Sequence, residues 1–402
     1  MSGISETLAP PAPPGPLEWL RKNMFSTWFN TLLTILSLVF LYFILVGTVR
    51  WIFFTADWSP VTIAPLLYLV GQYPRDQLWR PAASMLICVL LIGMSWAIWE
   101  RYIRTFAIFL GALLGVLALI PLETPTITLG VRAVFLSCPL LIYLGFWTGR
   151  RMRIKSQHVV TLWLVAAVLI VLVLLSGVRG IPGLPTVPTT AWGGLMVTLL
   201  LAVGGIVLSF PIGVLLALGR RSSLPVVKLF SILFIEVVRG VPLVTILFMF
   251  SVILVLFLPA ESRIDRLLRA LIAMVVFSAA YTAENVRGGL QAVPEGQVEA
   301  AKALGLNNFQ ITTFIVLPQA LRLVIPTIVG QFISLFKDTT LVVIVGITDL
   351  LGIGNAVLNL RPEFVRLQME VYLFIAAIYW IFSYFMSYAS LELEKALGVG
   401  ER

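Results

Sequence analysis

Six charged residues, in three close pairs, stand inside stretches of this chain that are otherwise apolar. They are Glu236 and Arg239, Glu284 and Arg287, and Lys337 and Asp338. Within a helix, residues three apart share a face and can form an ion pair. A charge in apolar surroundings needs such a partner or a water-filled cavity. The pairs therefore either satisfy themselves or line a polar cavity, and the sequence leaves both interpretations open.

A cavity of this kind would suit a zwitterion, which needs a cation for its carboxylate and an acid or a helix C-terminus for its ammonium. Gly240 and Pro242 weaken the helix after Arg239, and broken helices expose backbone groups that bind small polar molecules. The candidate substrate pathway consists of Glu236, Arg239, Tyr281, Glu284, Arg287, Lys337, Asp338 and Thr339.

A polar stretch, residues 294–318, interrupts the apolar second half of the chain. Pro294 suits the first position of a helix, and Gly305 suits the stop behind it. Asn307 or Asn308 can then cap a second short helix that runs toward Pro318. Two short helices between membrane spans are typical of a docking surface, whereas composition alone also fits an ordinary amphipathic loop.

The composition indicates the class of protein that holds these residues. Of the 402 residues, 59% are hydrophobic and 12% are charged, which is more apolar surface than a soluble core can bury. Apolar runs of about twenty residues recur without alternation, which favours membrane-spanning helices over a barrel. We expect an all-α polytopic membrane protein with about ten transmembrane helices. The net charge of +9 is spread over short loops, so nucleic-acid binding is not expected.

The chain divides at a stretch rich in glycine and proline. The expected segments are a proline-rich tail at 1–23, five N-terminal helices at 24–176, a linker at 177–190, a second five-helix set at 191–396 with its polar loop at 290–320, and a C-terminal tail at 397–402. Basic residues are more frequent in the segments that an inside N-terminus would leave in the cytoplasm. Both termini and the polar loop are therefore expected there.

The sequence lacks the residue patterns for metal binding, catalysis and ATP hydrolysis. Cys88, Cys138 and the single histidine, His158, form no cluster with metal-ligand spacing, so no metal site and no catalytic residue is expected. The chain contains no Gly-Lys pair and hence no phosphate-binding loop of the GxxxxGK[ST] type. We expect no ATP hydrolysis by this chain and do not expect it to be an enzyme.

The polar loop resembles the Glu-Ala-Ala signature of bacterial ABC-importer permeases. The matching residues are Glu299, Ala300, Ala301, Gly305, Leu317 and Pro318. In that family the loop is the cytoplasmic coupling helix that docks into the ATPase subunit. The resemblance therefore implies that these six residues couple this chain to an ATPase.

The charged pairs extend the resemblance. The stretches that begin at Glu236, Tyr281 and Lys337 look like the signatures of polar amino-acid ABC permeases, over about residues 190–395. Val238 and Val241 depart from the family pattern, which more often has small or polar residues there, and this departure bears on substrate preference. The last five helices then form a type I ABC-importer permease core. The extra N-terminal helices are similar to the M-type subunit of general L-amino-acid importers.

The resemblance implies the partners of the chain. They are two copies of an ABC ATPase subunit that use ATP and Mg, a second homologous permease subunit, a periplasmic amino-acid-binding protein, an L-amino-acid substrate and the lipid bilayer. No cofactor is expected on this chain itself. The implied location is the bacterial inner membrane, crossed many times.

Two other functions compete with this interpretation. An ion-gradient-driven secondary transporter or channel would also use charged pairs within the membrane. That alternative leaves the Glu-Ala-Ala loop unexplained, and the two halves show no convincing repeat. A membrane-embedded enzyme ranks behind both, because the chain offers no plausible nucleophile with its base.

Overall fold

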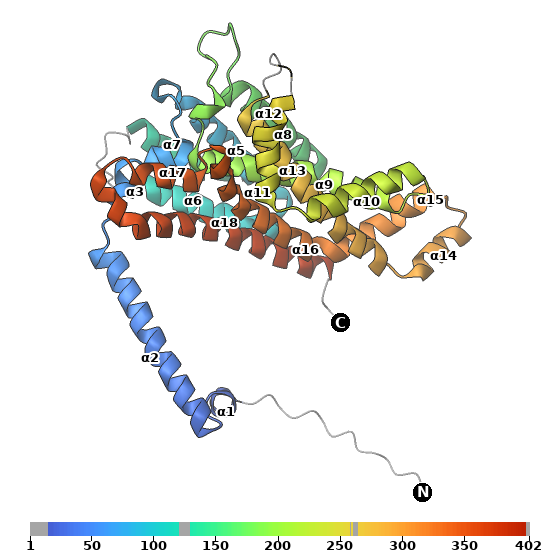
Figure 1. Ribbon diagram of the computed structural model, residues 1–402, viewed down its shortest axis with the longest axis horizontal. Coiled ribbons are helices and arrows are strands. Elements are labelled where there is room, and N and C mark those ends of the chain that lie inside the picture. The colour runs from blue at the N-terminus through green and yellow to red at the C-terminus, as the bar shows by residue number, and fades with distance from the viewer. Residues whose placement is uncertain (1–14, 120–128, 258, 260–263, 399–402) are drawn as a thin grey trace. The chain divides into compact units, whose positions relative to one another are not determined.

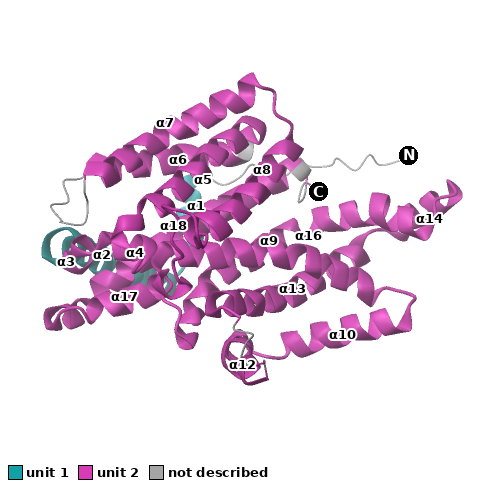
Figure 2. Ribbon diagram, turned by 90° about the horizontal axis from the view of Figure 1, so that it is seen from above, with its two compact units in different colours: residues 1–57 teal, residues 58–402 magenta. Residues whose placement is uncertain are grey.

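The computed structural model describes residues 15–119, 129–257, 259 and 264–398. Contacts between residues divide the chain into two units, residues 1–57 and residues 58–402 (Figure 2). The described part of unit 1 comprises α1 (Pro16–Asn23), α2 (Trp28–Arg50) and the π-helix η1 (Trp51–Thr55). Thr27 caps α2, since its side chain accepts a hydrogen bond from the Asn30 amide.

Unit 2 begins with the helices of the N-terminal half (Figure 1). They are α3 (Ser59–Ile63), α4 (Pro65–Val70), η2 (Arg75–Gln77), α5 (Trp79–Ile98), α6 (Glu100–Leu119), α7 (Leu129–Arg151), α8 (Ser156–Leu169) and η3 (Ile170–Leu175). The short helix η4 (Thr189–Ala191) then leads into the second half.

The second half of unit 2 contains the residues singled out above. Its helices are α9 (Gly194–Arg220), α10 (Pro225–Arg239), α11 (Leu243–Phe248), η5 (Met249–Ile253), α12 (Leu254–Phe257), α13 (Arg266–Ala292), α14 (Glu295–Ala303), α15 (Asn308–Gln310), η6 (Ile311–Val316), α16 (Leu317–Asp338), η7 (Thr339–Val345), α17 (Leu350–Leu358), η8 (Pro362–Leu367) and α18 (Gln368–Leu397).

The described residues confirm an all-α polytopic membrane protein. Eight helices are long and apolar enough to cross a membrane. Two more helices, Pro225–Arg239 and Leu243–Phe257, are long and apolar enough only together, and they meet at 106° around Gly240 and Pro242, as in a broken span or a re-entrant loop. Helix α6 is apolar over a shorter stretch, Ile103–Leu119. These helices are consistent with the roughly ten that we expect, while the predicted domain boundaries stay predictions.

The long helices approach one another closely at glycines. On α9, a Cβ added at Gly213 would lie 2.6 Å from the Thr282 side chain of α13. On α7, a Cβ at Gly145 would lie 3.0 Å from the backbone nitrogen of Met94 on α5. Small residues let membrane helices pack backbone to backbone, where dispersion contacts are the main attraction. These two contacts fix the positions of α13 and α5.

The ends of unit 2 can be told apart in both views. Helix α14 lies at one end of the bundle, and α3, α4 and α17 lie together at the other (Figures 1 and 2). We call these the α14 end and the α17 end. Helix α17 was not expected from the sequence. It forms because the Asp349 side chain accepts a hydrogen bond from the Gly352 amide and so caps its first turn.

A buried arginine joins the N-terminal half to the linker. Arg80 of α5 is fully buried. Its guanidinium donates to the backbone oxygens of Pro185 (2.8 Å) and Leu175 (3.2 Å), and also to that of Leu174. Leu174 and Leu175 end η3, whose terminal carbonyls have no partner within the helix and carry partial negative charge. The arginine charge is therefore compensated by backbone dipoles.

This arrangement predicts the effect of removing the guanidinium. Arg80→Met keeps most of the side-chain volume but leaves the carbonyl oxygens of Leu174 and Pro185 without this donor, whereas that of Leu175 keeps the Tyr73 hydroxyl at 2.9 Å. Since an unsatisfied buried group costs about 1–3 kcal/mol, the free energy of unfolding should fall by roughly 3 kcal/mol. Thermal denaturation of the detergent-solubilised protein measures this change. The exposed Arg75 gives the control Arg75→Met, and equal melting temperatures for the two variants would contradict the role of Arg80.

Candidate functional site

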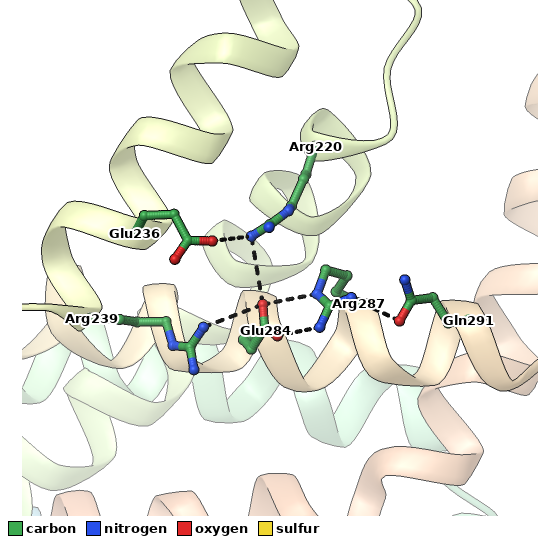
Figure 3. Close-up of polar contacts among 6 residues, drawn as sticks. All are labelled: Arg220, Glu236, Arg239, Glu284, Arg287 and Gln291. Atoms are coloured by element: carbon green, nitrogen blue, oxygen red, sulfur yellow. Dashed lines mark hydrogen bonds and ion pairs between the residues drawn. The ribbon is translucent and has the colours of Figure 1, made fainter.

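Five charged side chains from three helices meet at one point of the second half (Figure 3). We call this group the arginine–glutamate cluster: Arg220 of α9, Glu236 and Arg239 of α10, and Glu284 and Arg287 of α13. Helices α9 and α10 end at Arg220 and Arg239. The cluster therefore depends on where those helices stop as well as on which faces they present.

Glu284 is the centre of the cluster. Its Oε2 lies 3.4 Å from Arg239 Nη1 and 3.6 Å from Arg220 Nη1. Arg287 Nε donates to the same oxygen at 2.9 Å, and Arg287 Nη2 donates to Oε1. A single carboxylate thus faces three guanidinium groups from three helices. Arg287 also donates from Nη1 to Gln291 Oε1 at 2.7 Å.

The structure shows one of the two pairings that the spacing allows and not the other. Glu284 and Arg287 pair within α13, as their spacing of three predicts. Glu236 instead receives a hydrogen bond from Arg220 Nη1 at 2.8 Å, and Arg239 turns to Glu284. Of the two interpretations that the sequence leaves open for Glu236 and Arg239, pairing with each other is not the one seen, since each has a partner on another helix. Arg220 ends the neighbouring helix and competes for the same carboxylate, which spacing within one helix does not reveal.

The cluster carries more positive than negative charge, with three guanidinium groups facing two carboxylates. Arg239 is the member with spare donor capacity, since its buried Nε has no hydrogen-bond partner. The Arg239 guanidinium lies 5.6 Å from the centre of the Tyr281 ring, within the range of a cation–π contact. Guanidinium nitrogens bind carboxylates through two parallel hydrogen bonds. The excess positive charge of the cluster therefore favours one further carboxylate.

Helices α13 and α16 are joined next to the cluster by uncharged polar groups. Asn285 Nδ2 donates to Gln331 Oε1 at 2.7 Å. Gln331 Nε2 in turn donates to the Ser278 backbone oxygen at 2.8 Å and to Thr282 Oγ1 at 3.0 Å. Sequence reasoning missed these residues. The signal was the spacing of Ser278, Thr282 and Asn285, which places three polar groups on one face of a span.

The third predicted pair lies elsewhere. Lys337 and Asp338 end α16, six residues beyond Gln331 and thus roughly 9 Å farther along the helix axis. Lys337 is exposed and Asp338 is half-buried. The α-helix ends here, and the chain continues as the 3₁₀-helix η7 from Thr339. In the described part of the chain, neither charge forms an ion pair with the arginine–glutamate cluster. The eight candidate pathway residues thus fall into two groups.

The Glu-Ala-Ala loop folds at the α14 end (Figure 1). Pro294 precedes the helix as its N-cap, and α14 begins one residue later than expected. Gly305 follows α14 with φ +77°, the left-handed conformation that glycine adopts at little cost. Asn307 then caps the next helix, and Gln310 closes the capping box. The second short helix is not separate, since α15, η6 and α16 follow without a break.

The six predicted coupling residues differ in exposure. Glu299, Ala300, Gly305 and Pro318 are exposed, Leu317 is half-buried and Ala301 is buried. Ala301 belongs to a buried apolar cluster that also contains Val293, Ile311 and Ala320. One face of α14 is therefore fixed to α13 and α16, and the opposite face is free.

Comparison with known proteins is consistent with this arrangement. The family described as binding-protein-dependent transport system inner membrane component matches residues 209–397. The inner membrane amino-acid ABC transporter permease protein YhdY of Escherichia coli (strain K12) is 37% identical over 404 residues, covering 96% of this chain and 94% of that protein.

Two more relatives differ in their coverage. The glutamate/glutamine/aspartate/asparagine transport system permease protein BztC of Rhodobacter capsulatus is 36% identical over 428 residues, covering 98% of this chain and 97% of that protein. The probable glutamine ABC transporter permease protein GlnP of Bacillus subtilis (strain 168) is 35% identical over 204 residues, covering 50% of this chain and 91% of that protein.

The similarity to YhdY and BztC runs along nearly the whole of each chain. It supports a permease and does not support an ion-gradient-driven transporter or channel. Together with the helices long enough to span a membrane, it makes this chain a multi-pass inner membrane protein. The chain belongs to the family of ABC transporter permeases that these amino-acid permeases represent.

Proposed function

We propose that this permease imports L-amino acids and that a separate ATPase subunit, docked on residues 299–318, supplies the energy. The observation that carries the proposal is the geometry of the Glu-Ala-Ala loop. Helix α14 is packed against α13 and α16 on one side and presents Glu299 and Ala300 on the other. A partner that binds the free face can move both long helices.

The exposed side of the loop has the composition of a protein interface. Leu304 is 80% exposed, Phe309 is 74% exposed and Phe314 is 65% exposed. Aromatic residues are enriched in the cores of protein–protein interfaces, and large apolar side chains left in water mark a binding surface. Leu304 directly precedes Gly305, and Phe309 and Phe314 follow Asn307 in α15 and η6. We assign this surface to the ATPase subunit.

The arginine–glutamate cluster supports a substrate with a carboxylate. An amino acid offers one carboxylate, which matches the excess guanidinium charge and the unpartnered Nε of Arg239. The ammonium group of the amino acid would face Glu284, which the family resemblance also includes in the substrate pathway. The names of YhdY and BztC, which refer to amino acids, support the same class of substrate.

A polar stripe on α16 supports a second permease subunit. Thr327, Gly330, Ser334 and Lys337 are exposed and recur every three or four residues along a helix long enough to span the membrane. A continuous polar stripe is unfavourable against lipid. A second homologous permease would cover this stripe and close the pathway from that side.

The remaining parts of the assembly follow from this function. We propose that two ATPase subunits use ATP and Mg, that a periplasmic binding protein delivers the amino acid, and that this chain binds no cofactor and catalyses no reaction itself. Both termini and the α14 end would then face the cytoplasm.

The docking proposal predicts a different outcome for two glycines of the loop. Gly305→Val places a branched side chain at φ +77°, which costs about 1–2 kcal/mol or more. The equilibrium between this loop conformation and its alternatives should therefore change by about fivefold or more. ATP-driven amino-acid uptake by membrane vesicles containing the whole transporter should fall at least to the same extent. Recovery of the ATPase with the solubilised permease should fall as well.

Gly296→Val provides the matched control. Gly296 lies within α14, and a Cβ there meets nothing within 4 Å. This variant should retain most of its uptake, and membrane insertion should be unchanged in both. Wild-type uptake and ATPase recovery by Gly305→Val would exclude the coupling role of the turn.

The pathway proposal predicts that substrate affinity depends on Arg239. Arg239→Gln should weaken binding of the transported amino acid by at least about tenfold, since a charge-assisted hydrogen bond is worth about 1.5–3 kcal/mol. Calorimetric titration of the purified permease–ATPase complex, without the binding protein, measures this affinity directly.

Two controls sharpen this experiment. Glu236→Gln alters a carboxylate that is 53% exposed and reaches only Arg220 among the described ion pairs, so affinity should change little. The amine that corresponds to the substrate without its carboxylate should not compete. Equal affinities for wild type and Arg239→Gln would remove the cluster from the pathway.

A further inference from the structure

A buried chain of hydrogen bonds at the α17 end has no part in the coupling loop or in the arginine–glutamate cluster. Asp349 is fully buried. Its Oδ1 accepts from the Gly352 amide at 2.8 Å, and its Oδ2 lies 3.2 Å from the Tyr379 hydroxyl. That hydroxyl lies 3.1 Å from Thr339 Oγ1, which donates to the Phe336 carbonyl at 2.7 Å.

The number of hydrogens available to these hydrogen bonds indicates whether Asp349 is protonated. Three contacts between oxygens need a hydrogen each: Asp349 with Tyr379, Tyr379 with Thr339, and Thr339 with the Phe336 carbonyl. The two hydroxyl groups supply one hydrogen each. If Asp349 is ionised, one contact therefore brings two acceptors together without a hydrogen. A proton on Oδ2 completes the chain, with every donor pointing away from Asp349.

This series of hydrogen bonds connects four helical elements. Asp349 precedes α17, Tyr379 belongs to α18, and Thr339 begins η7 at the end of α16. Helix α9 joins through Thr198, whose Oγ1 accepts from the Leu350 amide at 3.0 Å. The proton on Oδ2 leaves the Tyr379 hydroxyl free to donate to Thr339 and so links α17, α18 and η7, whereas the bond from Leu350 to Thr198 does not depend on the proton.

The charged neighbours offer Asp349 no counter-ion. At the end of α16 that adjoins η7 the charged groups are Lys337, which is exposed, and Asp338; the beginning of α18 contributes the buried Glu370. Arg266 of α13 lies near η7, but it donates to the Gly346 carbonyl at 3.4 Å. Tyr68 of α4 and Tyr379 are the neighbouring phenols. Among the described residues no cation pairs with Asp349, and burial raises the pKa of its carboxyl.

We propose that Asp349 is a proton-binding site, protonated in this arrangement. Loss of the proton turns the Tyr379 hydroxyl toward the carboxylate and leaves its contact with Thr339 without a hydrogen, which loosens η7 from α18. The Asp349 carboxyl lies eleven residues after Asp338 in the sequence, at the end of the bundle opposite α14. Conformational changes that admit water to this end would favour proton release. This role of Asp349 does not depend on which substrate the protein transports.

The first test observes the proton directly. Asp349→Asn replaces the acid by an amide that can still accept from Gly352 and donate to Tyr379, so the fold should persist. The infrared difference spectrum between the wild-type and Asp349→Asn complexes near neutral pH should contain the carbonyl stretch of a protonated carboxylic acid. A difference spectrum that contains the bands of a carboxylate instead would overturn the proposal.

The second test uses stability. A carboxyl whose pKa is higher in the folded than in the unfolded chain binds more protons when folded. Its contribution is therefore largest below the ordinary aspartate value of about 3.9 and is lost as pH rises through the folded-state pKa. The melting temperature of the wild-type complex should fall with rising pH relative to that of Asp349→Asn.

Asp76→Asn is the control for this measurement. Asp76 is an exposed carboxylate of η2 that accepts a hydrogen bond from Gln77 and has no place in the hydrogen-bonded chain at Asp349. The melting temperature of this variant should follow that of the wild type at every pH. Parallel curves for wild type and Asp349→Asn would exclude a bound proton, whatever the outcome of the transport assays.

Discussion

Glu284 holds three helices together because its single carboxylate neutralises guanidinium groups from each of them. Arg220 ends α9, Arg239 ends α10 and Arg287 lies on α13 itself. Without the carboxylate, three positive charges would repel one another in surroundings that solvate them poorly. The position of α10 depends strongly on this point, since Gly240 and Pro242 interrupt its continuation and leave its end free to turn.

The same constraint explains how the structure treats its other buried charges. Arg80 has its charge compensated by carbonyl oxygens at the end of η3, and Arg269 likewise donates to the Ser251 carbonyl. Helix C-termini favour cations, because their last carbonyl groups carry partial negative charge. Asp349 is treated differently, since the proposed proton removes the charge of this buried carboxyl. Backbone dipoles or a proton thus compensate these three buried groups, while ion pairs hold the arginine–glutamate cluster together.

The features that follow from local rules could be predicted from the sequence. The length of the apolar runs predicts the spans, the spacing of Glu284 and Arg287 predicts their pair, and turn chemistry predicts Gly305 and Asn307. The partner of Glu236 could not be predicted, because Arg220 reaches it only through the packing of α9 on α10. The role of Asp349 was equally hidden, since it requires Tyr379 and Thr339 from elements far apart in the chain.

Helix α14 is held by apolar contacts, whereas the arginine–glutamate cluster is held by ion pairs. This difference suggests how a movement of α14 would be transmitted to the arginine–glutamate cluster. Val293 and Ala301 share one buried cluster with Ala320 of α16, so α14 cannot move without the adjoining ends of α13 and α16. From Ala292 back to Glu284 the chain is an unbroken helix of roughly 12 Å. Close-packed helices move as rigid bodies, whereas an ion pair at 3.4 Å can open without disturbing a core. The contact that breaks first would then be the one between Glu284 and Arg239, which frees the guanidinium that faces the proposed substrate.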